Sequence, residues 1–477
     1  MSEIAEMTLA EELSELLGPE RVSVEPVAIA EHSTDKWFAA HPPDVVVFAE
    51  STDDVSRLLK FCHRRGIPVT PRGAGVGYVG GCVPVCGGVA LSLARMNRIL
   101  EISSEDGVAV VQPGVITGEL QAAVKRLGMM YPPDPASLKE CSLGGNIATN
   151  AGGPRCLKYG VTRHYVLGLE VVLADGTVLR TGGRCHKNKT GFDLIGMFVG
   201  SEGMLGVVTE ATLRLIPHPE TRATISTSFQ KFTEAAAAVQ AVLGSGFHPA
   251  ALEIADKFTL EAARDYLGEG LVPEGEAHLM IELDGHAESV ALESAKLMAL
   301  LKSRGALSME LADTEAGCEH LWGLRREFSY SLRATGLTKL NEDVVVPRGR
   351  LVDLVNFAEE LQNESGMAIA CFGHAGDGNI HVNIMVADIE NEEVRARSEE
   401  VLDRLFRQVL EWEGVISGEH GIGIAKKRWF AEAVGAVSGE VHVTLKQALD
   451  PSNILNPDKF LGNFEVAGEA EPKVASF

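Results

Sequence analysis

The stretch that decides the fold is glycine-rich: PRGAGVGYVGG at residues 71–81. Within it, residues 75–80 match the letters of the GxGxxG dinucleotide-binding fingerprint. That fingerprint has to open a helix whose N-terminus receives the pyrophosphate. Here the chain continues into Gly-Gly-Cys-Val-Pro at residues 80–84, a run that does not begin a regular helix. The context disfavours a nicotinamide Rossmann site, although a loop of free backbone N–H groups can surround phosphates without a helix.

Glycine is concentrated in one region of the chain. Of the 477 residues, 50 are glycine, and many of them lie between residues 66 and 206. Glycine permits tight turns and a close approach of the backbone to a ligand. The enrichment therefore predicts a ligand site in the first half of the chain.

Charge and cysteine usage exclude several classes of protein. The formal net charge is −23, from 66 acidic and 43 basic residues, which disfavours a nucleic-acid partner. The eight cysteines are scattered without a CxxC pair, so we expect reduced thiols rather than a zinc ribbon or an iron–sulfur ligand set. The N-terminus lacks the features of a signal peptide, and no apolar run of about 18 residues predicts a membrane span. These observations favour a cytoplasmic protein.

The pattern of apolar residues predicts an α+β fold in two domains, at residues 1–219 and 220–477. In the first we expect helices at 8–18, 53–65 and 117–127, strands at 67–70, 89–93, 108–111 and 206–216, and a hairpin at 166–181 with an Asp-Gly turn. In the second we expect helices at 232–243, 287–304, 315–334, 350–363 and 390–412, with strands at 278–284, 307–311, 340–346, 367–373 and 380–386. Such units favour an antiparallel sheet with helices on one face.

Chemistry-bearing residues gather in the second half. In CFGHAGDGNIHVN, residues 371–383, His374 and His381 flank a tight turn, and His381 and Asn383 share one face of a strand. Two histidines with a glutamate form a common divalent-metal set that leaves positions open for substrate. The stretch SGEHGIG, residues 417–423, offers such a glutamate beside another histidine. The alternative is that these side chains only form hydrogen bonds within a polar core.

Five motifs of the first half carry a resemblance to a known family. PRGAGVGYVGG, PPDPAS, LGGNIATNAGG, KYG and FVGSEGMLGVVTEATLRLIP, in this order, resemble the FAD-binding domain of the vanillyl-alcohol oxidase superfamily, the p-cresol methylhydroxylase (PCMH) type. The resemblance implies a two-subdomain FAD-binding domain. It places cofactor contacts at Pro71, Arg72, Gly73, Ala74, Gly75, Val76, Gly77, Pro135, Ser137, Gly144, Gly145, Asn146, Thr149, Gly152, Gly153, Tyr159, Gly160, Glu202, Gly203, Gly206, Val207, Val208 and Asn456.

One departure from that family bears on how the flavin is held. Members that bind FAD covalently often carry a histidine just after the first loop's arginine and glycines, and here Val76 stands in that vicinity. No histidine occurs between Arg65 and His164. We therefore expect non-covalent FAD.

The second half resembles the C-terminal domain of FAD-linked oxidases, the group that includes D-lactate dehydrogenase, D-2-hydroxyglutarate dehydrogenase and the flavin subunit of glycolate oxidase. The matching motifs are GHAGDGNIH, GEHGIG and LDPSNILNPDKF. The resemblance implies a divalent metal, zinc or similar, on His374, His381 and Glu419, with His420 as the base. The resemblance also implies a substrate domain that ends in a helical C-terminal segment.

Cations near the middle of the second half complete the expected catalytic set. The resemblance places an arginine and a lysine as a clamp for a substrate carboxylate, and Arg325 and Lys339 match best. The spacing is one residue shorter than in relatives, so Arg326 is the alternative to Arg325. An arginine fork suits a carboxylate, and lysine adds a point charge. We expect Asn383 in the same set.

The predicted reaction is FAD-dependent oxidation of a D-2-hydroxy acid, D-lactate or glycolate, to the 2-oxo acid. Because the cysteines form no iron–sulfur motif, we expect electrons to pass to a separate acceptor, for example an iron–sulfur or electron-transfer flavoprotein partner. Such a partner could hold the protein at a membrane. Assembly into a homo-oligomer is a further alternative. The alternatives are a non-redox flavoenzyme like alkyldihydroxyacetone-phosphate synthase, or a flavin-carrying subunit without its own substrate site.

Overall fold

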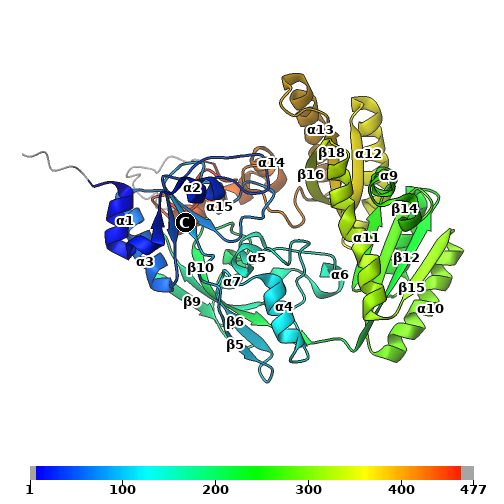
Figure 1. Ribbon diagram of the computed structural model, residues 1–477, viewed down its shortest axis with the longest axis horizontal. Coiled ribbons are helices and arrows are strands. Elements are labelled where there is room, and N and C mark those ends of the chain that lie inside the picture. Colours follow the sequence, from blue (N-terminus) through cyan, green and yellow to red (C-terminus); the bar gives the residue numbers. More distant parts are fainter. Residues whose placement is uncertain (1–6, 463–477) are drawn as a thin grey trace, which may run out of the picture.

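The computed structural model describes residues 7–462, and residues 1–6 and 463–477, at the ends of the two expected domains, lie outside the described part. The first half of the chain, blue to cyan in Figure 1, lies beside the second half, green to yellow. The last helices of the chain return to the first half. The expected division at residue 219 stays a prediction, and any division has to account for this return.

The first half contains two main sheets, as the two-subdomain resemblance implies. One has the order β1-β2-β4-β3: β1 (Val22–Ser23), β2 (Val45–Phe48), β4 (Val89–Ser92) and β3 (Val69–Arg72). The other is antiparallel, in the order β5 (Ile99–Ser103), β6 (Val108–Val111), β10 (Val207–Arg214), β8 (Val166–Val172) and β9 (Val178–Gly182). The predicted hairpin is confirmed, because β8 pairs with β9 in antiparallel register.

Helices α1 (Leu9–Leu17) and α3 (Thr52–Arg65) cover the first sheet. Helix α3 begins with a capping box, in which Ser51 accepts from the backbone of Asp54, and ends at Gly66 in the left-handed region. Helix α4 (Thr117–Lys125) packs beside the second sheet. All three helices were predicted from the periodicity of their apolar residues.

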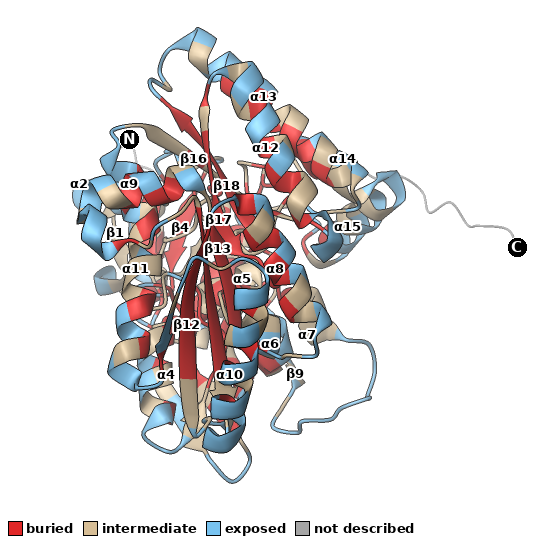
Figure 2. Cartoon of the chain, turned by 90° about the vertical axis from the view of Figure 1, so that its right-hand side faces the viewer, coloured by how far each residue is buried: buried red, intermediate tan, exposed pale blue. Residues whose placement is uncertain are grey.

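The second half is built on a seven-stranded antiparallel sheet in the order β15-β12-β14-β13-β17-β18-β16. The strands are β12 (Thr221–Phe229), β13 (Ala251–Ala255), β14 (Ala277–Gly285), β15 (Ser308–Ala312), β16 (Thr338–Val345), β17 (Ala368–His374) and β18 (Asn379–Val386). Figure 2 shows its central strands as the buried interior of this half. The expected antiparallel sheet is therefore confirmed.

Helices cover both faces of this sheet, so the expectation of helices on one face is wrong. One face packs against α8 (Phe232–Gly244), α10 (Ala287–Ser303), α12 (Leu351–Ser365) and α13 (Glu392–Glu411). The other packs against α9 (Lys257–Leu267) and α11 (Glu315–Ala334). The physical reason is that the central strands are apolar on both faces: Ile254 belongs to one core, and its neighbour Ala255 to another.

Strands β12 and β13 and a helix in the second glycine-rich stretch are among the elements that were not predicted. Strand β12 alternates threonine and serine with apolar residues, a period-two signal that the prediction missed, whereas β13 is buried throughout and gives no one-sided apolar pattern. The glycine-rich stretch after residue 143 was given no secondary structure, and its first part forms α5 (Leu143–Thr149), which Ser142 caps. A cap can thus outweigh the low helix propensity of two glycines.

The C-terminal segment is helical, as expected, and returns to the first half. After α14 (Lys427–Val434) and α15 (Ala436–Leu449), the chain passes beside β3, where Val69 N donates to Ile454 O at 2.7 Å. Ile454 and Leu455 are buried in the core under α1 and α3. Among the described helices, none is both long and apolar enough to cross a membrane.

Candidate functional site

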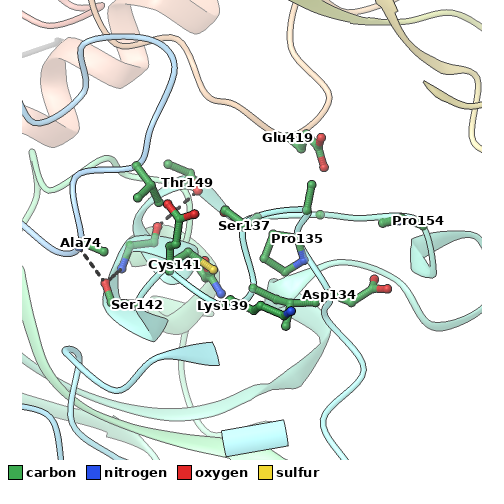
Figure 3. Close-up of a pocket in the computed structure, with 18 of the residues that line it drawn as sticks. Ala74, Asp134, Pro135, Ser137, Lys139, Cys141, Ser142, Thr149, Pro154 and Glu419 are labelled. Carbon is green, nitrogen blue, oxygen red and sulfur yellow. Dashed lines mark hydrogen bonds between the residues drawn. The ribbon is translucent and has the colours of Figure 1, made fainter. Parts of the chain in front are cut away.

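A cavity of about 1010 Å³ lies between the two halves of the chain. The glycine-rich loops of the first half line one side, and side chains from the seven-stranded sheet and α11 line the other. Figure 3 shows Ser142 and Pro135 from the first half and Glu419 from the second around the same cavity. The two regions that the sequence singled out therefore share one site.

The first glycine loop presents backbone N–H groups to the cavity. Among the described residues, the amides of Gly75, Val76 and Gly77 have no hydrogen-bond acceptor. Gly75 has a φ of +69°, and a Cβ added at Gly73 would lie 2.4 Å from Ser142 Oγ. As expected, the loop does not open a helix. Free amides on a concave loop suit a pyrophosphate group.

The second glycine motif is tied directly to the first. Ser142 Oγ caps α5 by accepting from Gly145 N at 3.4 Å, and it also accepts from Ala74 N at 3.2 Å (Figure 3). One hydroxyl thus joins the start of the helix to the loop. Of the residues expected to contact the flavin, those that line the cavity are Pro71, Arg72, Gly73, Ala74, Gly75, Val76, Gly77, Pro135, Ser137, Gly144, Gly145, Asn146, Thr149, Gly152, Glu202, Gly203, Gly206, Val207 and Val208.

The other four expected flavin contacts do not line the cavity: Gly153, Tyr159, Gly160 and Asn456. Tyr159 donates to Asp284 Oδ2 of β14 at 2.7 Å and so links the two halves of the chain. Asn456 Nδ2 donates to the carbonyl oxygens of Gly81, at 2.9 Å, and Glu202, at 2.7 Å. Tyr159 and Asn456 therefore hold segments that border the site.

The three expected metal ligands are close together. One ligand atom from each of His374, His381 and Glu419 can lie within 4.8 Å of the others. Glu419 Oε1 is 3.7 Å from His374 Nε2 and 3.5 Å from His381 Nε2. These separations are longer than hydrogen bonds. Two imidazole nitrogens and a carboxylate oxygen around one point form a donor set that fits a divalent cation.

A buried carboxylate orients the first of these histidines. His374 Nδ1 lies 2.7 Å from Glu253 Oε1, and His374 pairs with Glu253 across β17 and β13. A proton on Nδ1 in that contact leaves Nε2 free to face Glu419, the arrangement usual for a metal-binding histidine.

The charges of the cluster shift the pKa values of its members. Burial opposes protonation of His374, but Glu253 and Glu419 outweigh it and raise its pKa to about 10. Burial likewise opposes ionisation of Glu419, and the histidines, His374 first, lower its pKa to about 2. Burial holds the pKa of His381 well below its ordinary value. The Glu419 carboxylate is therefore ionised, as a carboxylate that binds a cation has to be.

His420 lies beside the cluster on a loop that one carboxylate organises. Asp343 Oδ2 accepts from the amides of Gly418, Glu419 and His420, at 2.9, 2.6 and 3.0 Å. Asp343 also contacts the buried Lys426. Although burial opposes ionisation, His420 and Lys426 hold the pKa of Asp343 well below its ordinary range. The loop is therefore bent around the Asp343 carboxylate. This bend allows the adjacent side chains of Glu419 and His420 to face the same cavity.

Of the two candidate arginines, Arg325 is the one that reaches the cluster. Its guanidinium donates to Glu253 Oε2 at 2.8 Å and lies 4.9 Å from the ring centroid of Phe372. Arg326 is half exposed and pairs with Glu319 on the same helix at 3.1 Å. The two ends of Glu253 thus hold Arg325 and His374, one on each oxygen.

Lys339 also lines the cavity, whereas Asn383 does not. Lys339 Nζ donates to Ser329 Oγ at 2.8 Å, and burial together with Arg333 and Arg325 lowers its pKa to about 8. Asn383 is fully buried, and its Nδ2 donates to the carbonyl oxygens of Ala370 and His381, both at 3.0 Å. Asn383 therefore supports β17 and β18 from within the sheet, without facing the cavity.

Four residues of the site were not predicted from the sequence: Glu253, Asp343, Ser329 and Tyr78. Glu253 interrupts an otherwise apolar strand, ALEIA, and Asp343 is a fully buried acid within the mixed strand TKLNEDVV. An acidic side chain in a buried strand costs free energy unless it is paired. Its presence there was therefore a signal for a buried partner of opposite charge. Ser329 lies one helical turn after Arg325, which places it on the same face of α11.

The comparisons with known proteins agree with this geometry. Residues 43–182 match the family described as "FAD binding domain", and residues 218–460 match "FAD linked oxidases, C-terminal domain". The second match spans more than half of the chain. The chain belongs to the FAD-linked oxidases, and it is an enzyme, an FAD-linked oxidoreductase.

Individual relatives narrow the class. The chain is 42% identical to glycolate oxidase subunit GlcD of Bacillus subtilis (strain 168), over 87% of this chain and 88% of that one. It is 36% identical to D-lactate dehydrogenase of Anaerostipes hadrus, over 87% and 89% of the two chains. The protein is thus an oxidoreductase of the GlcD and D-lactate dehydrogenase type.

Solved structures show the fold. p-Cresol methylhydroxylase superimposes with a TM-score of 0.79 at 21% identity, covering 95% of this chain and 96% of that one. Alkyldihydroxyacetonephosphate synthase superimposes with a TM-score of 0.72 at 20% identity, covering 94% and 83%. The resemblance to the PCMH-type fold is confirmed.

Proposed function

We propose that the enzyme oxidises a D-2-hydroxy acid, D-lactate or glycolate, to the 2-oxo acid. One observation carries the proposal: His420, Arg325 and Lys339 line the same cavity as the glycine loops of the FAD-binding half. A proton acceptor and two cations next to a flavin site are what the oxidation of a hydroxy acid requires.

The flavin would lie along the two glycine motifs. The free amides of residues 75–77 suit its pyrophosphate, and the start of α5 completes the same wall. We propose that FAD is held without a covalent bond, since no histidine stands near Val76 in the sequence. Acid denaturation should release intact FAD, and flavin retained on the precipitated protein would contradict this.

A divalent cation, zinc or similar, would be held by His374, His381 and Glu419. The support is the donor set itself, together with the contact from Glu253 that orients His374. Such an ion would supply Lewis acidity, polarising an oxygen atom of the substrate.

The side chains of the enzyme would divide the remaining work. Arg325 and Lys339 bind the carboxylate, and the Arg325 fork orients it. His420 accepts the hydroxyl proton at Nε2, because its Nδ1 faces Asp343 at 3.4 Å. FAD, when bound, would supply the acceptor for the hydride of the α-carbon. Loss of one proton and one hydride from the alcohol gives the 2-oxo acid, so the atoms balance.

The electrons then have to leave the flavin. The eight cysteines form no CxxC pair, so we propose a separate acceptor, such as an iron–sulfur or electron-transfer flavoprotein partner. The printed name of the Bacillus relative, a glycolate oxidase subunit, is in keeping with a partner. A redox dye substitutes for that acceptor in an assay.

The test is an anaerobic screen for flavin bleaching. D-lactate, glycolate, D-2-hydroxyglutarate and L-lactate are mixed separately with the FAD-loaded enzyme, and absorbance of the oxidised flavin is followed in a stopped-flow instrument. Bleaching by a D-hydroxy acid or glycolate, with L-lactate slower by at least about tenfold, is the expected result. Reduction by none of them would overturn the proposal and favour a flavin-carrying subunit.

A further inference from the structure

The flavin loop and the loop of the proposed base are bonded to each other. Val79 O accepts from Ile424 N at 2.8 Å and from Ala425 N at 3.1 Å. The carboxylate of Glu202 accepts from Ile422 N and Gly423 N, each at 2.8 Å. Residues 71–81 and 417–425 therefore form one unit, and Tyr78 lies directly before the junction.

Tyr78 lies against the ring of His420. The two ring centroids are 5.4 Å apart with planes 28° from parallel. His420 also stacks on His381, at 5.6 Å and 18°. The His420 ring is thus in contact with two other rings, one from each half of the chain.

Stacking is what holds the His420 ring, because hydrogen bonds do not. Within residues 7–462, the His420 ring nitrogens make no hydrogen bond, and Nδ1 is buried. The nearest acceptor, Asp343 Oδ1, is 3.4 Å from Nδ1 without the alignment of a bond. A general base has to be held in register with the proton that it accepts, so whatever restrains this ring matters for the reaction.

The phenol of Tyr78 is anchored from the opposite side of the cavity. Arg333 Nη2, on α11, donates to Tyr78 Oη at 2.9 Å. Tyr78 and Arg333 both line the cavity. This bond joins the flavin loop to the helix that carries Arg325, and it limits rotation of the phenol ring over His420.

We propose that Tyr78 is a positioning residue: its ring, stacked on His420, holds the imidazole at the angle at which it accepts the substrate proton. This inference rests on the proposed function of His420. It predicts that the aromatic ring matters for the rate of flavin reduction, and that the hydroxyl matters much less.

The test compares four variants in the FAD-loaded enzyme. Tyr78→Leu and Tyr78→Gln remove the ring, Tyr78→Phe keeps it, and Tyr266→Leu removes a half-exposed tyrosine of α9 that does not line the cavity. The limiting rate of anaerobic flavin reduction and the hydroxy-acid dissociation constant are measured, normalised to bound FAD. Loss of the stacked ring should lower the rate about 3- to 10-fold with an unchanged dissociation constant.

Tyr78→Phe should reduce its flavin within about twofold of the wild-type rate, because ring stacking does not need the hydroxyl. Tyr266→Leu should be unchanged. The two non-aromatic variants differ in polarity, so one serves if the other fails to fold or to hold FAD. Equal rates for Leu, Gln and wild type, or a Phe variant as slow as Leu, would overturn the proposal.

A second readout does not depend on turnover. Diethyl pyrocarbonate carbethoxylates accessible imidazole nitrogens, and the peptide containing His420 is quantified by mass spectrometry. A freer His420 ring should react about 3- to 10-fold faster in Tyr78→Leu than in wild type, with Tyr78→Phe unchanged. If no hydroxy acid reduces the wild-type flavin, the proposed function fails, and this modification rate alone decides the role of Tyr78. Equal modification of His420 in all variants would then overturn the positioning role of Tyr78.

Discussion

The two faces of the seven-stranded sheet are made by the same strands but differ in what they carry: the apolar face packs into one large core, and the cavity face combines a smaller apolar cluster with charged side chains. Along β18, Ile380, Val382 and Ile384 point into the apolar core under α8, α10, α12 and α13. Between them, His381 faces the other way, into the cavity. Residues alternate between faces because the side-chain period of a strand is two. The role of each face depends on what covers it. Helices α8, α10, α12 and α13 cover the apolar face, whereas the FAD-binding half, α9 and α11 cover the other.

The buried charged side chains on the cavity face stabilise one another in pairs. Glu253 is 1% exposed and carries Arg325 on one oxygen and His374 on the other. Asp343 is fully buried and balances Lys426. Removing one partner from a buried pair leaves an uncompensated charge, which costs more than the pair contributes. Changes on this face should therefore affect both chemistry and stability, and changes on the apolar face should affect stability alone.

The largest effects should come from the proposed metal ligands and the base. We expect His374→Ala, His381→Ala and Glu419→Ala each to lower bound metal and activity together. His420→Ala should keep its metal and lower the rate of single-turnover flavin reduction roughly 10²–10⁴-fold, the usual effect of losing a general base. Metal content by mass spectrometry, measured beside stopped-flow reduction, separates the two groups.

FAD content provides the control for these four variants, since the glycine loops lie in the other half and should keep the flavin. A His420→Ala protein without metal would contradict the division of roles. So would a wild-type enzyme that remains fully active after chelation and contains no metal.

The next effect belongs to Arg325. Arg325→Ala removes a charge-assisted contact worth about 1.5–3 kcal/mol, so the Michaelis constant should rise roughly 10- to 100-fold. Thermal stability should fall as well, because buried Glu253 loses a partner. Arg326→Ala is the matched control: it is half exposed and paired with Glu319, and its effect should stay within about twofold. A large effect at Arg326 alone would place the clamp one residue further on.

A smaller, pH-dependent effect should come from Lys339. Its pKa is lowered to about 8 by burial and by the neighbouring cations Arg333 and Arg325. Binding of a carboxylate needs the protonated amine, so this contribution is present below pH 8 and is lost as the pH rises through that value. The dissociation constant should rise by at most about tenfold per pH unit there. In Lys339→Met this rise should disappear, and an unchanged pH profile in that variant would exclude Lys339 from the clamp.

The smallest effect should come from the opposite face. Ile380→Val, one residue before His381, removes one methylene from the apolar core and should cost about 0.5–1.5 kcal/mol of unfolding free energy. Chemical denaturation measures this loss. The rate of flavin reduction per bound FAD should be unchanged, since Ile380 points away from the cavity. A rate loss comparable to that of Arg325→Ala would show that the two faces are not independent.

Several elements were predictable because their signals are local. Helix α3 has a capping box and a terminal glycine, and the hairpin of β8 and β9 has its Asp-Gly turn. Strand β13 escaped prediction because a strand buried on both faces loses the one-sided pattern that marks a half-exposed strand, whereas the alternation in β12 was a signal that the prediction missed. The contact between Arg325 and Glu253 was also out of reach, since 72 residues separate them in the chain.

The sequence alone determined the cofactor class, the candidate metal ligands and the candidate base, because ordered motifs of fixed spacing carry them. Only the tertiary structure decided which neighbours those residues have. Register across β13 and β17 places Glu253 behind His374, and the turn of α11 directs Arg325, not Arg326, to Glu253. The return of the C-terminal chain brings residues 421–425 onto Val79 and leaves Tyr78 stacked on His420. Such contacts join segments that are far apart in the chain, and packing, which is not encoded in local spacing, sets them.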